Sequence, residues 1–268
     1  MSTNIFLIKH GESAISNLKA ESPVPSEAQN LLTENGENQI KMLSLLFKKE
    51  LKSAVIWSSP SSRVIQSAKI TSEVFKSEIQ VSDMISDRLQ NIEGVNLKKY
   101  RDMQELVGNN PFFVPDGGES FIEHRQRVQS WFSSFIVNLD FKENYFIFSH
   151  GATIEHINSF LLGQSVFASR YSYAVCYPGR FHHWVAERGD LHNLSFELRS
   201  SNSFEILPDL ANIALVSDTG SKNINIESNM ISEEEAASIQ KKLDVFKSSA
   251  FEKGGDSLES GGSASYHR

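Results

Sequence analysis

The chain has 268 residues, of which 40% are hydrophobic and 22% charged, the composition of an ordinary globular protein. Its 26 basic and 33 acidic side chains give a formal charge of −7, which argues against a nucleic acid or a membrane surface as partner. The single cysteine, Cys176, excludes an internal disulfide and any multi-cysteine metal site. No apolar run reaches the roughly 18 residues of a membrane span, and no signal-peptide pattern is present. A cytoplasmic protein is expected.

Short apolar runs alternate with amphipathic segments along most of the chain. The runs are typical of strands buried on both faces, and the amphipathic segments of helices. This alternation predicts an α/β fold, a three-layer α/β/α sandwich with a largely parallel central sheet. In chain order, we predict a strand at 5–8, a helix at 33–51, a strand at 54–57, a helix at 61–75, a strand at 81–85, a loop-rich segment with one short helix at 86–118, a helix at 121–139, a strand at 145–148, a helix from 151 through 162, and strands at 171–175, 181–186 and 194–198.

The composition changes after about residue 212, where Ser, Asn, Glu, Lys and Gly dominate. We therefore expect a folded domain over residues 1–212 and a polar C-terminal extension over residues 213–268. One short helix is predicted at about 232–247, because Ser232 and Glu235 form a capping box before an apolar face. The Gly/Ser-rich end of the extension is expected to be disordered.

Two predicted strands end in the same pair of residues. His10-Gly11 follows the strand at 5–8, and His150-Gly151 follows the strand at 145–148. Ligands of open α/β sheets bind in the crevice at the carboxyl ends of the strands. Glycine lets backbone approach a ligand closely, and a helix that begins just afterwards directs N–H groups at an anion. The repeated pattern indicates a shared anion site.

A third strand end carries a candidate cation. Ser58-Ser59-Pro60 follows the strand at 54–57 and places Arg63 in the first turn of the next helix. An arginine there can extend over the same crevice and hold an anion with two parallel hydrogen bonds.

These segments, in this order, resemble the histidine phosphatase superfamily, which has the phosphoglycerate-mutase-like fold, and in particular its phosphatase branch. The resemblance covers about residues 4–200. The matching motifs are Lys9-His10-Gly11-Glu12-Ser13, Leu32-Thr33-x-x-Gly36-x-x-Gln39, Ser58-Ser59-Pro60 with Arg63 and Gln66-Ser67-Ala68, Pro115-x-Gly117-Gly118-Glu119-Ser120, and Ser149-His150-Gly151.

The resemblance implies a phosphomonoesterase that acts on a small phosphorylated substrate. His10 would be the nucleophile and form a phosphohistidine that water then hydrolyses. His150 would donate hydrogen bonds to the phosphoryl oxygens as charge develops on them, and Lys9 and Arg63 would bind the phosphate. Neighbouring cations would lower the pKa of His10 and keep its imidazole neutral. No metal and no other cofactor is implied.

The sequence departs from the family at the general acid, which usually follows a Leu-x-Glu pattern. Here the corresponding position is Asn91, whose amide cannot donate a proton to the leaving alkoxide. Glu93 is the candidate replacement, and Glu119 is a weaker one. Because general acid catalysis typically contributes about 10²–10⁴-fold, its loss would slow the enzyme and leave phosphate binding intact.

Two further departures concern phosphate binding. Lys9 stands where the family usually has arginine, so the charge is kept and the planar fork is lost. Ser16 occupies the place where the family often has asparagine, and Asn17 comes one residue later. Both Ser16 and Asn17 are candidate phosphate donors.

Two alternatives to a phosphatase stay open. Lys9 and Asn91 motivate a non-catalytic, phospholigand-binding or regulatory protein that has kept the pocket and lost the acid. A phosphoglycerate-type mutase is the other alternative, although the segment from Leu89 to Gly117 is shorter than the insert that mutases usually carry there.

Overall fold

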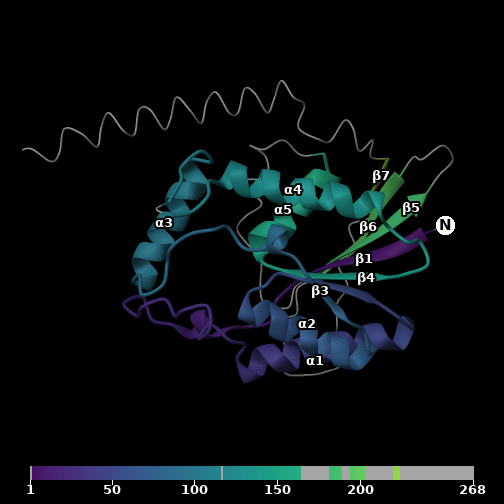
Figure 1. Ribbon diagram of the computed structural model, residues 1–268, viewed down its shortest axis with the longest axis horizontal. Helices are drawn as coiled ribbons and strands as arrows, with labels where there is room; N and C mark the ends of the chain where they lie inside the picture. The colour runs from purple at the N-terminus through teal and green to yellow at the C-terminus, as the bar shows by residue number, and fades with distance from the viewer. Residues whose placement is uncertain (1, 116, 164–180, 189–193, 203–219, 224–268) are drawn as a thin grey trace, which may run out of the picture. The chain divides into compact units, whose positions relative to one another are not determined.

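The computed structural model describes residues 2–115, 117–163, 181–188, 194–202 and 220–223. In these residues a seven-stranded sheet of order β3-β2-β4-β1-β5-β6-β7 forms the middle layer (Figure 1). Four strands pair in parallel, and these are β1 (Ser2–Lys9), β2 (Val55–Ser58), β3 (Ile79–Val81) and β4 (Tyr145–Ser149). The antiparallel strands are β5 (Phe181–Arg188), β6 (Leu194–Asn202) and β7 (Gly220–Asn223).

Helices cover both faces of the sheet. Figure 1 shows α1 and α2 on one face and α4 and α5 on the other, with α3 near one end of the sheet. No helix in the described ranges combines the length and the hydrophobicity that crossing a lipid bilayer requires. The helices are α1 (Glu34–Glu50), α2 (Ser62–Phe75), α3 (Leu97–Asn109), α4 (Phe121–Val137) and α5 (Gly151–Leu161), with 3-10 turns η1 (Ala14–Asn17) and η2 (Asp83–Ile85).

The sheet separates two hydrophobic cores, as strand β1 illustrates. Successive side chains of a strand point to opposite faces. Ile5 and Leu7 are buried in the core that α4 and α5 complete, whereas Phe6 and Ile8 are buried in the core that α1 and α2 complete. A continuous apolar run is therefore what a strand between two helix layers requires, and the predicted α/β/α sandwich is confirmed.

The helices agree with the sequence expectations to within two residues at each end. Helix α1 begins where the Thr33 side chain accepts a hydrogen bond from the Gly36 N–H at 3.0 Å. Helix α4 begins with a capping box. The Ser120 side chain accepts a hydrogen bond from the Glu123 N–H, and the Glu123 side chain accepts one from the Ser120 N–H. These caps satisfy N–H groups that have no partner within the helix. The loop-rich segment contains α3, the one short helix expected there.

Two expectations for the sheet need correction. The strand predicted at 81–85 is instead β3 at Ile79–Val81, followed by η2. The Ser82 side chain accepts a hydrogen bond from the Met84 N–H and so favours a turn where the apolar pattern suggested extended chain. Among the described strands, parallel pairing also occurs only between β1, β2, β3 and β4, and β5 pairs with β1 in the antiparallel direction. The predicted strands near 5–8, 54–57, 145–148, 181–186 and 194–198 are all present.

Some expectations lie outside the described residues, namely the strand at 171–175 and the helix at 232–247. The chain divides into two units, Met1–Met230 and Ile231–Arg268, and every described residue lies in the first. Strand β7 lies beyond residue 212, where the sequence suggests that the domain ends, and it pairs with β6.

The loop after β1 packs directly against the start of α1. A Cβ atom added to Gly36 would lie 2.1 Å from the Glu12 carbonyl oxygen, and one added to Gly11 would lie 2.4 Å from the Gly36 carbonyl oxygen. The Thr33 N–H also donates to the Glu12 carbonyl oxygen at 2.9 Å. Helix α1 therefore fixes the backbone that carries His10.

This contact predicts that Gly36→Ala destabilises the protein. The new methyl group meets backbone atoms that cannot move cheaply, and such overpacking costs about 1–3 kcal/mol of unfolding free energy. Urea unfolding measures this quantity. The matched control is Asn38→Ala, at an exposed position of the same helix, where we expect a change of less than about 0.5 kcal/mol. Stabilisation by Gly36→Ala of about 1 kcal/mol, the ordinary effect of this change inside a helix, would contradict the contact.

Candidate active site

The carboxyl ends of three parallel strands meet at one edge of the sheet. The His10 N–H, just after β1, donates to the Ser149 carbonyl oxygen of β4 at 3.1 Å. The Ser59 N–H, just after β2, donates to the Phe148 carbonyl oxygen at 3.1 Å. As a result the imidazole rings of His10 and His150 lie side by side, with centroids 5.5 Å apart and planes at 67°. The two histidines are 140 positions apart in sequence, and the register of the sheet brings them together.

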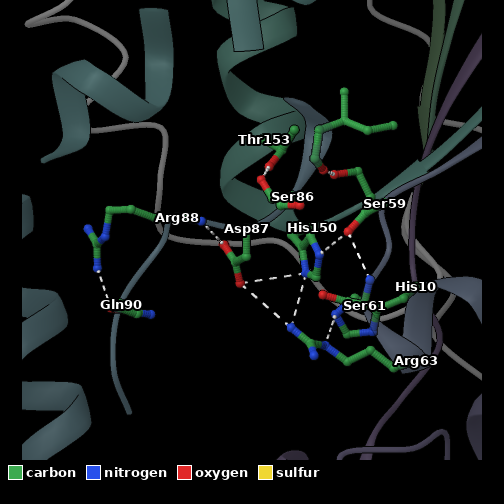
Figure 2. A network of polar contacts seen from close by, with 12 residues as sticks. His10, Ser59, Ser61, Arg63, Ser86, Asp87, Arg88, Gln90, His150 and Thr153 are labelled. Carbon is green, nitrogen blue, oxygen red and sulfur yellow. Dashed lines mark hydrogen bonds and ion pairs between the residues drawn. The ribbon is translucent and has the colours of Figure 1, made fainter. Parts of the chain in front are cut away.

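Arg63 joins the two imidazoles (Figure 2). It lies in the first turn of α2 and is buried. Its Nε donates to His10 Nε2 at 3.3 Å, and its Nη2 lies 3.1 Å from His150 Nδ1. Its Nη1 donates to both carboxylate oxygens of Glu27, at 3.1 and 2.9 Å. One guanidinium therefore contacts both rings and the carboxylate of Glu27.

These contacts define the protonation of both rings. A guanidinium can only donate, so His10 Nε2 and His150 Nδ1 must each present a lone pair. His10 Nδ1 then carries the proton and donates to the Gly11 carbonyl oxygen at 2.7 Å. His150 Nε2 carries the proton and donates to Ser59 Oγ at 3.0 Å. Both rings are neutral, and Nε2 of His10 carries an unprotonated lone pair.

Burial and positive charge keep both histidines neutral. Burial lowers the pKa of His10 well below 6.5, and the charges of Arg63, His150 and Lys9 lower it further. Burial also lowers the pKa of His150 well below 6.5, with Arg63 and Lys9 again adding to the effect. Desolvation and nearby cations both disfavour the imidazolium.

The pocket beside the two rings has a volume of about 770 Å³. Of the residues singled out from sequence, it is lined by Lys9, Ser16 and Glu93, together with His10, Arg63 and His150. Asn91 also lines it, and both Asn91 and Glu93 are exposed. The first turn of α5, at Gly151 and Ala152, forms part of the wall, so the positive end of a helix faces the pocket.

Two residues that the sequence suggested for the site, Asn17 and Glu119, do not line the pocket. The Asn17 amide lies 3.5 Å from Glu12 Oε1 in an exposed contact, away from the pocket lining. Glu119 is buried, where it forms an ion pair with Arg127 and accepts the Leu89 N–H at 2.9 Å. Its carboxylate therefore holds the loop before α3 in place and does not reach the pocket.

Asp87 is a pocket carboxylate that the sequence reasoning missed. Its Oδ2 lies 3.5 Å from His150 Nδ1 and 3.8 Å from Arg63 Nη2 (Figure 2). Its side chain is 38% exposed, and its Oδ1 accepts the Arg88 N–H at 3.0 Å. A signal for it was present, because Asp87 lies two residues beyond the strand predicted at 81–85, at the same edge of the sheet.

The remaining histidines of the helices lie outside the pocket. His124 of α4 and His156 of α5 are both buried, and their rings contact each other at a centroid distance of 4.7 Å. Within the described parts of the chain, no three His, Cys, Asp or Glu side chains are grouped so that they could hold a metal ion.

This fold, with two histidines and an arginine at the carboxyl ends of its parallel strands, defines the phosphoglycerate-mutase-like class of α/β proteins. The chain belongs to the histidine phosphatase superfamily (branch 1), whose family model matches residues 5–174. The family resemblance noted in the sequence is thereby confirmed. No curated protein sequence matches the chain.

Solved structures with the same fold include some whose names describe phosphatases. A mycobacterial glucosyl-3-phosphoglycerate phosphatase in complex with VO3 is 14% identical, with a TM-score of 0.62 over 75% of this chain and 100% of that one. A putative alpha-ribazole-5'-P phosphatase from Escherichia coli is 18% identical, with a TM-score of 0.59 over 75% and 96%. YhfR from Bacillus stearothermophilus is 19% identical, with a TM-score of 0.58 over 70% and 92%. At these identities the similarity establishes the fold.

The two site histidines are predicted to be neutral in opposite tautomers. Because their pKa values are lowered well below 6.5, neither ring should titrate around pH 6.5, where an ordinary histidine does. Nitrogen-15 NMR of the imidazoles should show His10 protonated on Nδ1 and His150 on Nε2, with signals assigned through His10→Gln and His150→Gln. Titration of either ring near pH 6.5 would show that the site is open to water.

Proposed function

We propose that the protein hydrolyses phosphate monoesters through a phosphohistidine formed on His10. The observation that carries this proposal is the unprotonated Nε2 of His10, which a buried guanidinium contacts at 3.3 Å. A neutral imidazole is a competent nucleophile, and the same guanidinium stabilises the negative charge of a phosphoryl group beside it. The metal-independent route follows from this pair, because cationic side chains supply the charge stabilisation.

In the first step, His10 Nε2 attacks phosphorus and the bond from phosphorus to the ester oxygen breaks. Lys9 and Arg63 bind the phosphoryl oxygens, and His150 donates through the Nε2 proton that Ser59 accepts in the free protein. We assign the additional neutral donor to Ser16 in preference to Asn17, because Ser16 lines the pocket and Asn17 contacts Glu12. In the second step, water attacks the phosphohistidine, inorganic phosphate is released and His10 Nε2 regains its lone pair.

A protonated carboxyl must supply the proton of the leaving alcohol, and the pocket offers Asp87 and Glu93. We favour Asp87, because its carboxylate lies 3.5 Å from His150, whereas Glu93 lines the exposed part of the pocket. Glu93 remains the competing candidate.

The substrate is proposed to be a small phosphorylated molecule. The names of two solved structures of the same fold, glucosyl-3-phosphoglycerate phosphatase and putative alpha-ribazole-5'-P phosphatase, support this, because both refer to small phosphate esters. The formal charge of −7 on the chain also disfavours a polyanionic polymer as substrate.

The central prediction is release of phosphate from p-nitrophenyl phosphate and its loss in His10→Ala. Removing a nucleophile should lower kcat by about 10³-fold or more. The matched control is His183→Gln, because His183 hydrogen-bonds to Asn4 outside the pocket, and this variant should keep the activity. An acid-labile phosphoryl group should also be trapped on the wild-type chain and not on His10→Ala.

The same assay separates the alternatives. Binding of inorganic phosphate without any turnover would contradict hydrolysis and favour a non-catalytic phospholigand-binding protein. An isomerised product in place of free phosphate would favour a mutase.

The proton donor is tested with two substrates that differ in their leaving group. Asp87→Asn should lower kcat on an alkyl phosphate by about 10²–10⁴-fold, because an alkoxide needs a proton as it leaves. On p-nitrophenyl phosphate the loss should be much smaller, since p-nitrophenolate leaves unprotonated. Glu93→Gln is the matched variant in the same pocket. If Glu93→Gln shows the leaving-group dependence, Glu93 is the acid, and equal mild losses in both variants would mean that neither is.

A further inference from the structure

All three nitrogens of the Arg63 guanidinium already contact acceptors of the protein. Its Nε donates to His10 Nε2, and its Nη2 lies 3.1 Å from His150 Nδ1 (Figure 2). Its Nη1 donates to both carboxylate oxygens of Glu27, at 3.1 and 2.9 Å. These contacts engage all but one of the five N–H groups of an arginine. A phosphoryl group that binds Arg63 through two parallel N–H groups must therefore displace at least one of these acceptors.

Glu27 is the acceptor that is easiest to displace. Its side chain is 55% exposed, whereas His10 and His150 are buried. A carboxylate that leaves Arg63 is hydrated at once, so the loss of an ion pair with an exposed partner costs little. A buried imidazole nitrogen would instead lose its only hydrogen bond, which is expensive. An incoming anion therefore exchanges with Glu27.

The contacts of Glu27 are those of a bound anion. Besides pairing with Arg63, its Oε1 accepts the Ser62 N–H at 2.8 Å. Ser62 is the first residue of α2, and the preceding Ser61 makes no hydrogen bond from its side chain to the start of this helix. The carboxylate thus lies between a guanidinium and a helix N-terminus, two groups that also bind phosphate.

The chain on either side of Glu27 keeps the carboxylate near Arg63. On one side, the Val24 N–H donates to the Val95 carbonyl oxygen at 2.8 Å. On the other side, the buried Asn30 accepts the Ile15 N–H at 3.3 Å through its side-chain oxygen. Glu27 itself lies on the exposed turn between these anchors. Its effective concentration at Arg63 is therefore high, even after an anion has displaced it.

We propose that Glu27 is an internal competitor of phosphate at Arg63. Its carboxylate pairs with Arg63 in the free protein, is displaced by the phosphoryl group of the substrate, and returns as inorganic phosphate leaves. This inference rests on the proposed function, because that function places the phosphoryl group at His10 and Arg63. The cost of displacing Glu27 applies to substrate and product alike, so Glu27 weakens the binding of both without assisting the chemical step.

The test measures phosphate affinity in Glu27→Gln. Glutamine keeps the size of the side chain and can still accept the Ser62 N–H, but it lacks the charge. The KM for p-nitrophenyl phosphate and the inhibition constant of inorganic phosphate should both fall by about 3- to 10-fold, as expected for loss of an ion pair with one exposed partner, and kcat should not rise. A purely structural role of Glu27 predicts the opposite, namely weaker binding in the variant.

Glu21→Gln is the matched control. Glu21 precedes the same turn, is exposed, and accepts the Asn96 amide at 3.1 Å outside the pocket lining. This variant changes the net charge by the same amount, but its charge is screened from the site, so both constants should stay within about twofold of wild type. A gain in affinity as large as that of Glu27→Gln would show a general charge effect and overturn the proposal.

A crystal structure of the wild-type protein with vanadate at His10 tests the displacement directly. The Glu27 carboxylate should then lie beyond ion-pair distance of Arg63 Nη1. A vanadate complex in which the Arg63–Glu27 pair persists would overturn the internal competitor, whatever the variants show.

The two proposals fail in different ways. If p-nitrophenyl phosphate is hydrolysed and Glu27→Gln leaves both constants unchanged or raises them, the internal competitor is overturned and the phosphatase stands. If wild type hydrolyses nothing, the proposed function fails, and calorimetric titration with inorganic phosphate decides the competitor. Tighter binding by Glu27→Gln than by wild type would then support it, whereas equal, weaker or undetectable binding by the variant would overturn it.

Discussion

The contact of one guanidinium with two imidazoles is the interaction on which the site depends. Arg63 can only donate, so its contacts with His10 and His150 require an unprotonated nitrogen on each ring. Its charge also disfavours protonation of both rings. A single side chain therefore sets the tautomers of both histidines and keeps both rings neutral, and in the proposed mechanism it also supplies positive charge for a phosphoryl group.

The sheet makes this contact possible. His10, Ser59 and His150 follow three parallel strands whose carboxyl ends are hydrogen-bonded to one another. Two hydrophobic cores, one on each face, hold the strands in register. The backbone contact between Gly11 and Gly36 leaves the loop of His10 little room to shift. The site is consequently built on rigid elements, as catalysis that relies on preorganised charge requires.

The arginines in and around the pocket differ in the groups that they contact. Glu27, an exposed carboxylate, pairs with Nη1 of Arg63. Glu119 neutralises Arg127 and thereby fixes the loop that carries Asp87 and Arg88. Arg88 itself faces neutral amides. Cations and carboxylates therefore line the same pocket, and ion pairs and amide contacts fix the positions of the arginines Arg63 and Arg88.

The sequence by itself determined the order of strands and helices, since continuous apolar runs and helical periodicity are local properties that burial between layers enforces. It also indicated His10, Arg63 and His150, because the two histidines directly follow strands and Arg63 lies in the first turn of the helix after a third strand. It placed β3 too late, since the turn set by Ser82 competes with an apolar pattern. Only the tertiary structure revealed Asp87 beside His150, Arg88 without a counter-ion and Glu119 paired with Arg127. Each of these outcomes depends on which side chains come within contact distance in the folded chain, as Asp87 and His150 do from different parts of the sequence, and a local pattern does not specify such contacts.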